Sequence, residues 1–232
     1  MTDLRFWAVV PAAGVGKRMG ANIPKQYLEL NGRPVIEHTL ERLLSHADIA
    51  GAYVSLGAED EWWPDTAFSN HPEVVRVQGG AERCHSVLNA LDELAKVADA
   101  KDWVLVHDAA RPCVRKEDLD ALIVNAEMYA TGALLGMPVK DTMKRTDAEG
   151  IIQSTVDRDN LWHAFTPQMF RLGFLRDCLS RALQAGVLVT DEASAVEWAG
   201  YKPVMVEGHA DNLKITRPED LPLAGYYLKH QE

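Results

Sequence analysis

Short apolar runs that alternate with helical patterns constrain the fold of this 232-residue chain more than any other feature of its sequence. These runs are short and apolar enough to be buried on both faces, as strands of a parallel sheet are. They lie at residues 6–10, 52–56, 74–77, 103–106 and 133–139. Amphipathic spacing predicts helices at residues 34–44, 82–97, 116–130, 171–185 and 191–199. The alternation predicts an α/β fold, with a Rossmann-like, mostly parallel twisted sheet and helices on both faces.

The last third continues this pattern. Residues 203–206 resemble a strand, and Thr216-Arg217-Pro218-Glu219 has the form of a capping box that starts the last helix. The segment from Thr155 to Gln168 is dense in polar groups beside Trp162 and Phe165. Arg158 makes it a candidate second anion site, and the alternative is a surface loop. Because no linker rich in Gly, Pro or Ser separates the segments, we expect residues 1–232 to form a single domain.

Residues 141–156 break the pattern and predict a protruding β-hairpin arm. Its turn falls at residues 147–150, with strand-like residues on both sides. An isolated two-stranded hairpin is marginal in water. We therefore expect the arm to pack against something, and a second subunit is a good candidate.

Composition excludes several classes of protein. The formal net charge of −10 argues against nucleic acid as the main partner. No apolar run approaches the ~20 residues that a membrane span needs, and the start of the chain lacks the long apolar region of a secretory signal. The three cysteines are far apart, which suggests neither a disulfide framework nor a zinc site. A reducing cytoplasm is the expected location.

A glycine-rich segment with local positive charge follows the first predicted strand, at residues 9–25 (VVPAAGVGKRMGANIPK). No acidic residue lies between Asp3 and Glu29, whereas Lys17, Arg18 and Lys25 all do. Glycines let backbone N–H groups approach phosphate oxygens, and nearby bases offset their charge. The spacing fits neither the dinucleotide fingerprint nor the P-loop. We interpret the segment as a polyphosphate loop of another type, against the alternative of an ordinary loop with solvated bases.

Two further segments lie at predicted strand ends. Asp108 follows the strand at 103–106, where a carboxylate can bind Mg²⁺ that bridges substrate phosphates; the alternative is a turn cap or an ion pair with Arg111. After the strand at 74–77, Gly79 and Gly80 permit close backbone approach. There Arg83 can reach a phosphate and Ser86 can hydrogen-bond a base or sugar, although such turns are common for structural reasons alone.

The remaining polar residues give weaker signals. Arg158 and Lys214 are candidate anion sites, and either could equally lie in a surface loop. The eight histidines show no metal-ligand spacing, so we expect His107 and the others to have structural roles. No Ser, His and Asp pattern indicates nucleophilic catalysis.

Eight segments taken together, in this order, closely resemble the 2-C-methyl-D-erythritol 4-phosphate cytidylyltransferase family. They are PAAGVGKRMG, PKQY, GGAERCHSV, VLVHDAARP, DTMKR, TVDRDNLWHAFTPQ, TDEASAVE and DNLKITRPEDL, and they run essentially end to end. The resemblance implies transfer of CMP from CTP to methylerythritol 4-phosphate with release of pyrophosphate. It also implies a divalent cation, normally Mg²⁺, and a homodimer in which the hairpin arm reaches the partner's site.

The resemblance also assigns roles to residues. It implies that Arg18 and Lys25 stabilise the transition state and that Arg158 and Lys214 position the substrate phosphate. The implied nucleotide-binding residues are Ala12, Ala13, Gly14, Gly80, Arg83, Ser86 and Ala109. Those implied near the methylerythritol or the metal are Asp108, Arg111, Thr142, Thr166 and Thr190, with Asp108 as the metal ligand. Ala81 departs from the family, which often has a polar or acidic residue after the glycine pair, and this leaves one CTP contact unassigned.

Other functions share parts of this pattern. A ribitol 5-phosphate cytidylyltransferase would share the CTP loops and differ mainly at the acceptor pocket. A sugar-1-phosphate nucleotidyltransferase would have a similar first loop with another base and acceptor. A non-catalytic nucleotide-binding protein is a third alternative, which the two separate anion sites argue against. The WHAFTPQ and TDEAS segments favour methylerythritol phosphate, by resemblance only.

Overall fold

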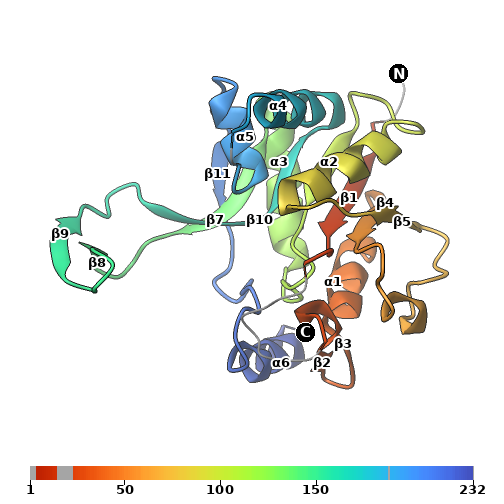
Figure 1. Cartoon of the computed structure of the whole chain (residues 1–232), viewed down its shortest axis with the longest axis horizontal. Coiled ribbons are helices and arrows are strands. Elements are labelled where there is room, and N and C mark those ends of the chain that lie inside the picture. Colours follow the sequence, from red (N-terminus) through yellow and green to blue (C-terminus); the bar gives the residue numbers. More distant parts are fainter. Residues whose placement is uncertain (1–3, 15–22, 188, 232) are drawn as a thin grey trace.

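The fold is built on a twisted seven-stranded sheet with the strand order β11-β7-β10-β6-β1-β4-β5 (Figure 1). The structure is a computed structural model that describes residues 4–14, 23–187 and 189–231. In the sheet so described, β10 runs antiparallel to its two neighbours while the other pairs are parallel. The α/β class with a mostly parallel sheet is confirmed.

The strands of this sheet lie close to the predicted ranges. They are β1 Phe6–Pro11, β4 Ile49–Leu56, β5 Val74–Gln78, β6 Trp103–Val106, β7 Ala133–Pro138, β10 Trp162–Arg171 and β11 Val204–Glu207. Two small sheets pair β2 Glu29–Leu30 with β3 Arg33–Pro34, and β8 Met143–Thr146 with β9 Ile152–Val156. The helices are α1 Val35–Leu44, α2 Arg83–Leu94, α3 Lys116–Met128, α4 Leu172–Gln184, α5 Glu192–Trp198 and α6 Asp220–His230. Short 3₁₀ helices lie at η2 Lys25–Tyr27 and η3 Trp63–Asp65.

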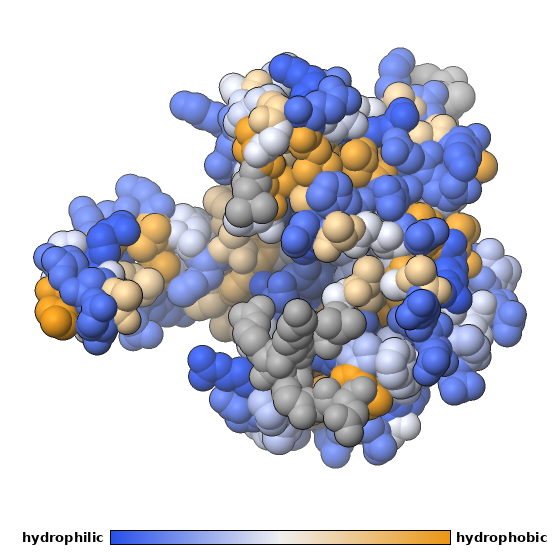
Figure 2. Space-filling model, in the orientation of Figure 1, coloured by the Kyte–Doolittle hydropathy of each residue, from blue (hydrophilic) through white to orange (hydrophobic). Residues whose placement is uncertain are grey.

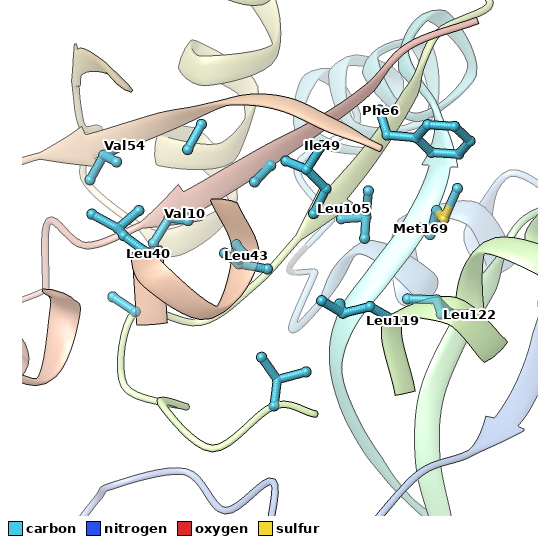
Figure 3. Close-up of a cluster of buried hydrophobic side chains, with 14 of the residues drawn as sticks. Phe6, Val10, Leu40, Leu43, Ile49, Val54, Leu105, Leu119, Leu122 and Met169 are labelled. Atoms are coloured by element: carbon cyan, nitrogen blue, oxygen red, sulfur yellow. The ribbon is translucent and has the colours of Figure 1, made fainter. Parts of the chain in front are cut away.

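Alternate residues of the central strands face two separate hydrophobic layers. In β6, Leu105 packs with the layer that contains α1 and α3, whereas Val104 and Val106 pack with the layer that contains α2, α4 and α5. Figure 3 shows the first layer, where Leu40 and Leu43 of α1 lie beneath the strands. Because successive side chains of a strand point to opposite faces, a strand covered on both sides must be apolar throughout. The sheet therefore has helices on both faces, as predicted.

β10 is a strand where the sequence indicated a polar segment. It lies between β7 and β6, and its second half is buried. Pro167 interrupts its pairing with β7, where the register shifts between Ala164 and Gln168. Proline within a run argues against a central strand, because it cannot donate a ladder hydrogen bond. Because Pro167 and the polar residues around it do not form an apolar run, this strand was not predicted from the sequence.

Two smaller predictions were wrong. The strand at β5 was expected to be buried on both faces, but it is an edge strand, and Val75 and Arg76 are exposed. The last helix does not start with a capping box at Thr216. Instead it begins at Asp220, whose carboxylate accepts hydrogen bonds from the backbone N–H groups of Thr216 and Arg217 at 2.7 and 2.8 Å.

The hairpin formed by β8 and β9 extends away from the sheet as an arm (Figure 1). Most of its surface is hydrophilic, with small apolar patches (Figure 2). Ile151 and Ile152, at the start of β9, are 63% and 60% exposed. The predicted hairpin arm is therefore present. Within the described residues, no helix is both long enough and apolar enough to cross a bilayer.

Candidate active site

A pocket of about 250 Å³ lies at the carboxyl ends of β1 and β6 and at the start of α2. Ligands in open α/β sheets bind beyond the carboxyl ends of the strands. The walls of this pocket come from the loops after β1, β5 and β6 and from the segment before α6. They include Ala12, Ala13, Gly14, Lys25, Gly80, Arg83, Ser86, Asp108, Ala109 and Lys214. The structure thus brings together ten of the residues to which a nucleotide, catalytic or metal role was assigned.

The first wall is the glycine-rich loop, described as far as Gly14. The N–H of Ala12 donates to the carbonyl of Ser55 at 2.8 Å, and the Gln26 amide donates to the carbonyl of Ala12 at 2.7 Å. This loop packs directly on Gly79, where an added Cβ would lie 2.4 Å from the Cβ of Ala13. Glycine at position 79 therefore allows two backbone segments to meet beside the pocket, as the sequence predicted.

Ser86 closes the turn between the glycine pair and α2. Its Oγ accepts a hydrogen bond from the N–H of Gly80 at 3.0 Å and donates to the carbonyl of Glu82 at 3.2 Å. The side chain is buried but lines the pocket. In this arrangement Ser86 shapes the turn and presents little of its hydroxyl to a ligand.

Asp108 is the centre of the polar cluster. Its Oδ1 accepts from Nε of Arg83 at 3.1 Å, and its Oδ2 lies 2.8 Å from Nζ of Lys214 and 3.5 Å from Nε of Arg111. Burial alone would raise the pKa of Asp108, but the charges of Arg83, Lys214 and Arg111 outweigh it and hold that pKa well below its usual range. The carboxylate is therefore ionised at any physiological pH.

Arg83 also binds a second carboxylate, that of Glu192 at the start of α5. Two guanidinium nitrogens contact the two Glu192 oxygens at 2.6 and 3.1 Å, and the Glu192 side chain is 1% exposed. Burial raises the pKa of Glu192, and Arg83 opposes this rise. Burial would likewise lower the pKa of Arg83, but Glu192 and Asp108 reverse this, and the pKa lies above its usual range. Arg83 thus joins α2, α5 and the turn after β6.

The two lysines of the pocket come from opposite ends of the chain. Lys25 begins η2 and donates from Nζ to the carbonyl of Ile215 at 3.1 Å. Ile215 follows Lys214, so the two ammonium groups approach the pocket from neighbouring segments. Arg18, the other cation expected to act with Lys25, lies outside the described residues.

Five predicted site residues that the structure describes are not among those that line the pocket. Two of them, Arg111 and Thr166, are buried and contact Asp108. The other three are exposed. Thr142 is exposed at the base of the arm. Arg158 is exposed there too, and its guanidinium donates to the carbonyl of Lys140. Thr190 is exposed before α5, and its N–H donates to Oγ of Ser194 at 3.1 Å. In a single chain, Arg158 and Lys214 are therefore not held together.

Three buried polar residues that support the site were not predicted from the sequence: Gln26, Glu192 and Asn212. Each lies inside a segment that carried the family resemblance, namely PKQY, TDEASAVE and DNLKITRPEDL. Their position in polar motifs was the available signal. Their burial depends on partners distant in sequence, which no local pattern reveals.

Comparison with known proteins decides the family. The family model described as 2-C-methyl-D-erythritol 4-phosphate cytidylyltransferase matches residues 6–230. This chain belongs to that family. A curated relative of this name from Aeromonas hydrophila is 58% identical over 233 residues, which cover 100% of this chain and 93% of the relative. Another from Vibrio vulnificus is 53% identical over 225 residues, covering 97% and 95%.

Solved structures agree with this membership. The crystal structure of the Francisella tularensis 2-C-methyl-D-erythritol 4-phosphate cytidylyltransferase has a TM-score of 0.85 at 34% identity. The alignment covers 96% of this chain and 99% of the other. As a cytidylyltransferase of this family, the chain is a nucleotidyl-transferring enzyme. Family membership supports methylerythritol phosphate as the acceptor and gives no support to the ribitol 5-phosphate alternative.

Proposed function

We propose that the pocket binds CTP and that the chain transfers CMP from CTP to the phosphate of 2-C-methyl-D-erythritol 4-phosphate. The observation that carries this proposal is the contact between Lys214 and Asp108, inside a pocket walled by the loops after β1, β5 and β6. It puts a cation and a carboxylate beside a loop suited to phosphates. Family membership supplies the two substrates.

The reaction needs no general base, because the acceptor phosphate is already an anionic nucleophile. One of its oxygens forms a bond to the α-phosphorus of CTP while the bond from that phosphorus to the bridging oxygen breaks, and pyrophosphate leaves with the electron pair. The obstacle is bringing one anion onto another. Catalysis must therefore come from alignment and from charge neutralisation.

The cations of the site divide this work. Lys25, with Arg18 of the glycine-rich segment, stabilises the charge that grows on the α-phosphate and on the leaving group. Lys214, which lies 2.8 Å from Asp108 Oδ2, holds the attacking phosphate together with Arg158. Arg83 is already bound to two carboxylates, so its contribution is to hold Asp108 as much as to attract phosphate.

The donor set of the pocket fits Mg²⁺ as the cofactor. The described residues include no group of three or more His, Cys, Asp or Glu side chains that could hold a metal ion. Mg²⁺ is, however, commonly bound by one or two carboxylates together with substrate phosphates. Asp108 supplies one ionised carboxylate at the pocket wall. When bound there with CTP, the ion would neutralise phosphate charge.

We further propose that the arm completes the site of a second copy in a homodimer. Thr142 and Arg158 lie at the base of the arm and are exposed in a single chain. Ile151 and Ile152 lie exposed near its tip, which favours burial against another chain. The three cysteines are free, which suits a reducing cytoplasm.

The direct test is to incubate the purified chain with CTP, Mg²⁺ and either methylerythritol 4-phosphate or ribitol 5-phosphate, and to follow pyrophosphate release. We expect release with methylerythritol phosphate alone. Release only with ribitol phosphate would change the identity of the acceptor substrate and leave the proposed mechanism in place. Silence with both, in protein shown to be folded, would refute the proposed activity.

Mixing two inactive variants tests the shared site. Arg158→Ala and Lys214→Ala each damage every site of a homodimer. If the arm serves the partner's pocket, a mixed dimer has one doubly damaged site and one intact site, so activity returns on mixing. If Arg158 serves its own pocket, each site keeps one defect and mixing restores nothing.

A further inference from the structure

Three hydrogen bonds and one ion pair join four polar residues that link the two sides of the pocket. The N–H of Asp108 donates to Oγ1 of Thr166 at 3.0 Å, and the carbonyl of Thr166 accepts from Nδ2 of Asn212 at 2.9 Å. The carbonyl of Asn212 accepts from Nη1 of Arg111 at 2.7 Å, and Nε of Arg111 returns to Asp108 Oδ2 at 3.5 Å. All four residues are buried. We call this set the Thr166 ring.

The Thr166 ring joins three segments that are distant in sequence. Asp108 and Arg111 lie in the turn after β6, Thr166 lies at the bulge of β10, and Asn212 lies two residues before Lys214. Bulges next to active sites commonly re-aim a side chain. At this position the hydroxyl of Thr166 contacts the turn that contains Asp108, and its carbonyl contacts the segment that contains Lys214.

We propose that Thr166 is a positioning residue that holds Asp108 and Lys214 in register through this ring, and that its hydroxyl donates no hydrogen bond to substrate. This goes beyond the role near methylerythritol that the family resemblance implied. It rests on the proposed transfer reaction, in which Asp108 and Lys214 act together.

The direction of each hydrogen bond follows from the chemistry of the partners. The carbonyl of Arg111 can only accept, so Nε2 of His107, 3.0 Å away, carries a proton. In the neutral imidazole Nδ1 then has the lone pair and accepts from the Thr166 hydroxyl at 3.0 Å. The hydroxyl oxygen is left to accept from the N–H of Asp108. The one proton of Thr166 is thus committed inside the protein.

The kinetic test replaces Thr166 with its isostere. Thr166→Val removes the hydroxyl and leaves both the Asp108 N–H and His107 Nδ1 without a partner. Outer partners that orient the ligands of metal sites typically contribute about 10–100-fold to activity, and we expect the same scale for a residue that orients Asp108. We expect kcat to fall by that factor, because alignment is lost, and Thr166→Ser to restore it. Thr66→Val is the matched control, since Thr66 is equally buried at 5% and its hydroxyl donates to the Trp63 carbonyl, away from the pocket.

A second variant tests the ring itself. Asn212→Asp sets a carboxylate oxygen against the carbonyl of Thr166, so we expect a similar fall in kcat. The double variant with Thr166→Val should lose much less than the product of the two single losses, because both break one network. Fully multiplicative losses would overturn the ring as a unit.

The third readout needs no substrate. Long-range ¹H–¹⁵N spectra of the full chain should show His107 protonated on Nε2 alone, and Thr166→Val should shift its Nδ1 resonance. A proton on Nδ1 in the wild type would overturn the proposal, even if Thr166→Val did not fold. So would an unchanged kcat with a raised KM for methylerythritol phosphate, which indicates a lost substrate contact. An inactive wild type would refute the proposed function while leaving the spectra informative.

Discussion

Arg83 makes a bidentate contact with Glu192, at 2.6 Å from Nη1 to Oε1 and 3.1 Å from Nη2 to Oε2. The same side chain reaches Asp108 through Nε at 3.1 Å. The guanidinium group is planar, so binding both of its Nη atoms to one carboxylate fixes the direction of its Nε–H. Glu192 thus determines where Arg83 points, and Arg83 in turn holds Asp108 at the pocket wall.

Glu192→Gln should destabilise the fold strongly. Breaking a buried ion pair costs roughly 3–5 kcal/mol when the remaining charge has no other partner. Arg83 keeps Asp108 as a partner, so we expect a loss toward the lower end of that range. Urea denaturation measures this change in the free energy of unfolding. Asp92→Asn is the control, because Asp92 pairs with Arg176 on the surface, is 49% exposed, and its pair contributes about 0–1 kcal/mol. Equal losses in the two variants would contradict the inferred role of Glu192.

Lys25→Ala should abolish most activity while the protein stays folded. Removing one preorganised donor from a charge-stabilising site costs about 10²–10³ in kcat. Loss of the Nζ hydrogen bond to Ile215 costs about 1 kcal/mol of stability. We expect the same activity loss for Arg18→Ala. Lys96→Ala, which removes an exposed lysine paired with Glu93, should have wild-type turnover; wild-type turnover in Lys25→Ala would refute its assigned role.

Stability should depend on pH through His107. Burial lowers the pKa of this imidazole from about 6.5 to about 4. Between these values the unfolded chain binds more protons than the folded one, so stability rises with pH and is lost as pH falls from 6.5 toward 4. A shift of this size corresponds to about 3 kcal/mol. Thermal or urea unfolding across this window should show the loss, and a folded His107→Gln variant should show less of it; an identical slope would exclude His107 as the cause.

Gly79→Ala should weaken CTP binding. A Cβ at this position would lie 2.4 Å from Ala13 Cβ and 3.1 Å from the Leu56 carbonyl, which forces the two pocket loops apart. Overpacking of this kind costs roughly 1–3 kcal/mol of stability. Because the strain is relieved by moving the loops that wall the pocket, we expect the KM for CTP to rise. Gly57→Ala is the control, because an added Cβ there meets nothing within 4 Å. A KM that changes equally in both variants would show that space beside Ala13 is not limiting.

The sequence predicted those parts of the fold that are encoded locally. Apolar runs and 3.6-residue spacing located most strands and helices within a few residues, because burial on two faces leaves a plain mark on a strand. β10 was not predicted, because its polar residues and Pro167 are not typical of a central strand. In the structure it lies between β6 and β7, in the middle of the sheet. Tertiary pairing there outweighs local preference.

The site residues also divide into those that a local sequence pattern predicts and those that depend on distant partners. Asp108 and Gly80 were predictable because they lie just beyond strands, where ligands of α/β proteins bind. Lys25 was predictable because it belongs to the positively charged segment that follows the first strand. Glu192 and Asn212 were not, because their significance comes from partners far along the chain, Arg83 and Thr166. The arm was expected from its turn and alternating residues. Its separation from the pocket of its own chain became clear only from the placement of Arg158.

The arm has a consequence for how this enzyme can be re-engineered. The chain leaves the sheet at the end of β7 and returns at the start of β10, where Trp162 pairs with Pro138 and the Val139 N–H donates to the Leu161 carbonyl at 2.9 Å. Departure and return are thus neighbours in one ladder. We therefore expect that residues 139–161 can be shortened, lengthened or replaced by the arm of another cytidylyltransferase without changing the register of any strand of the sheet.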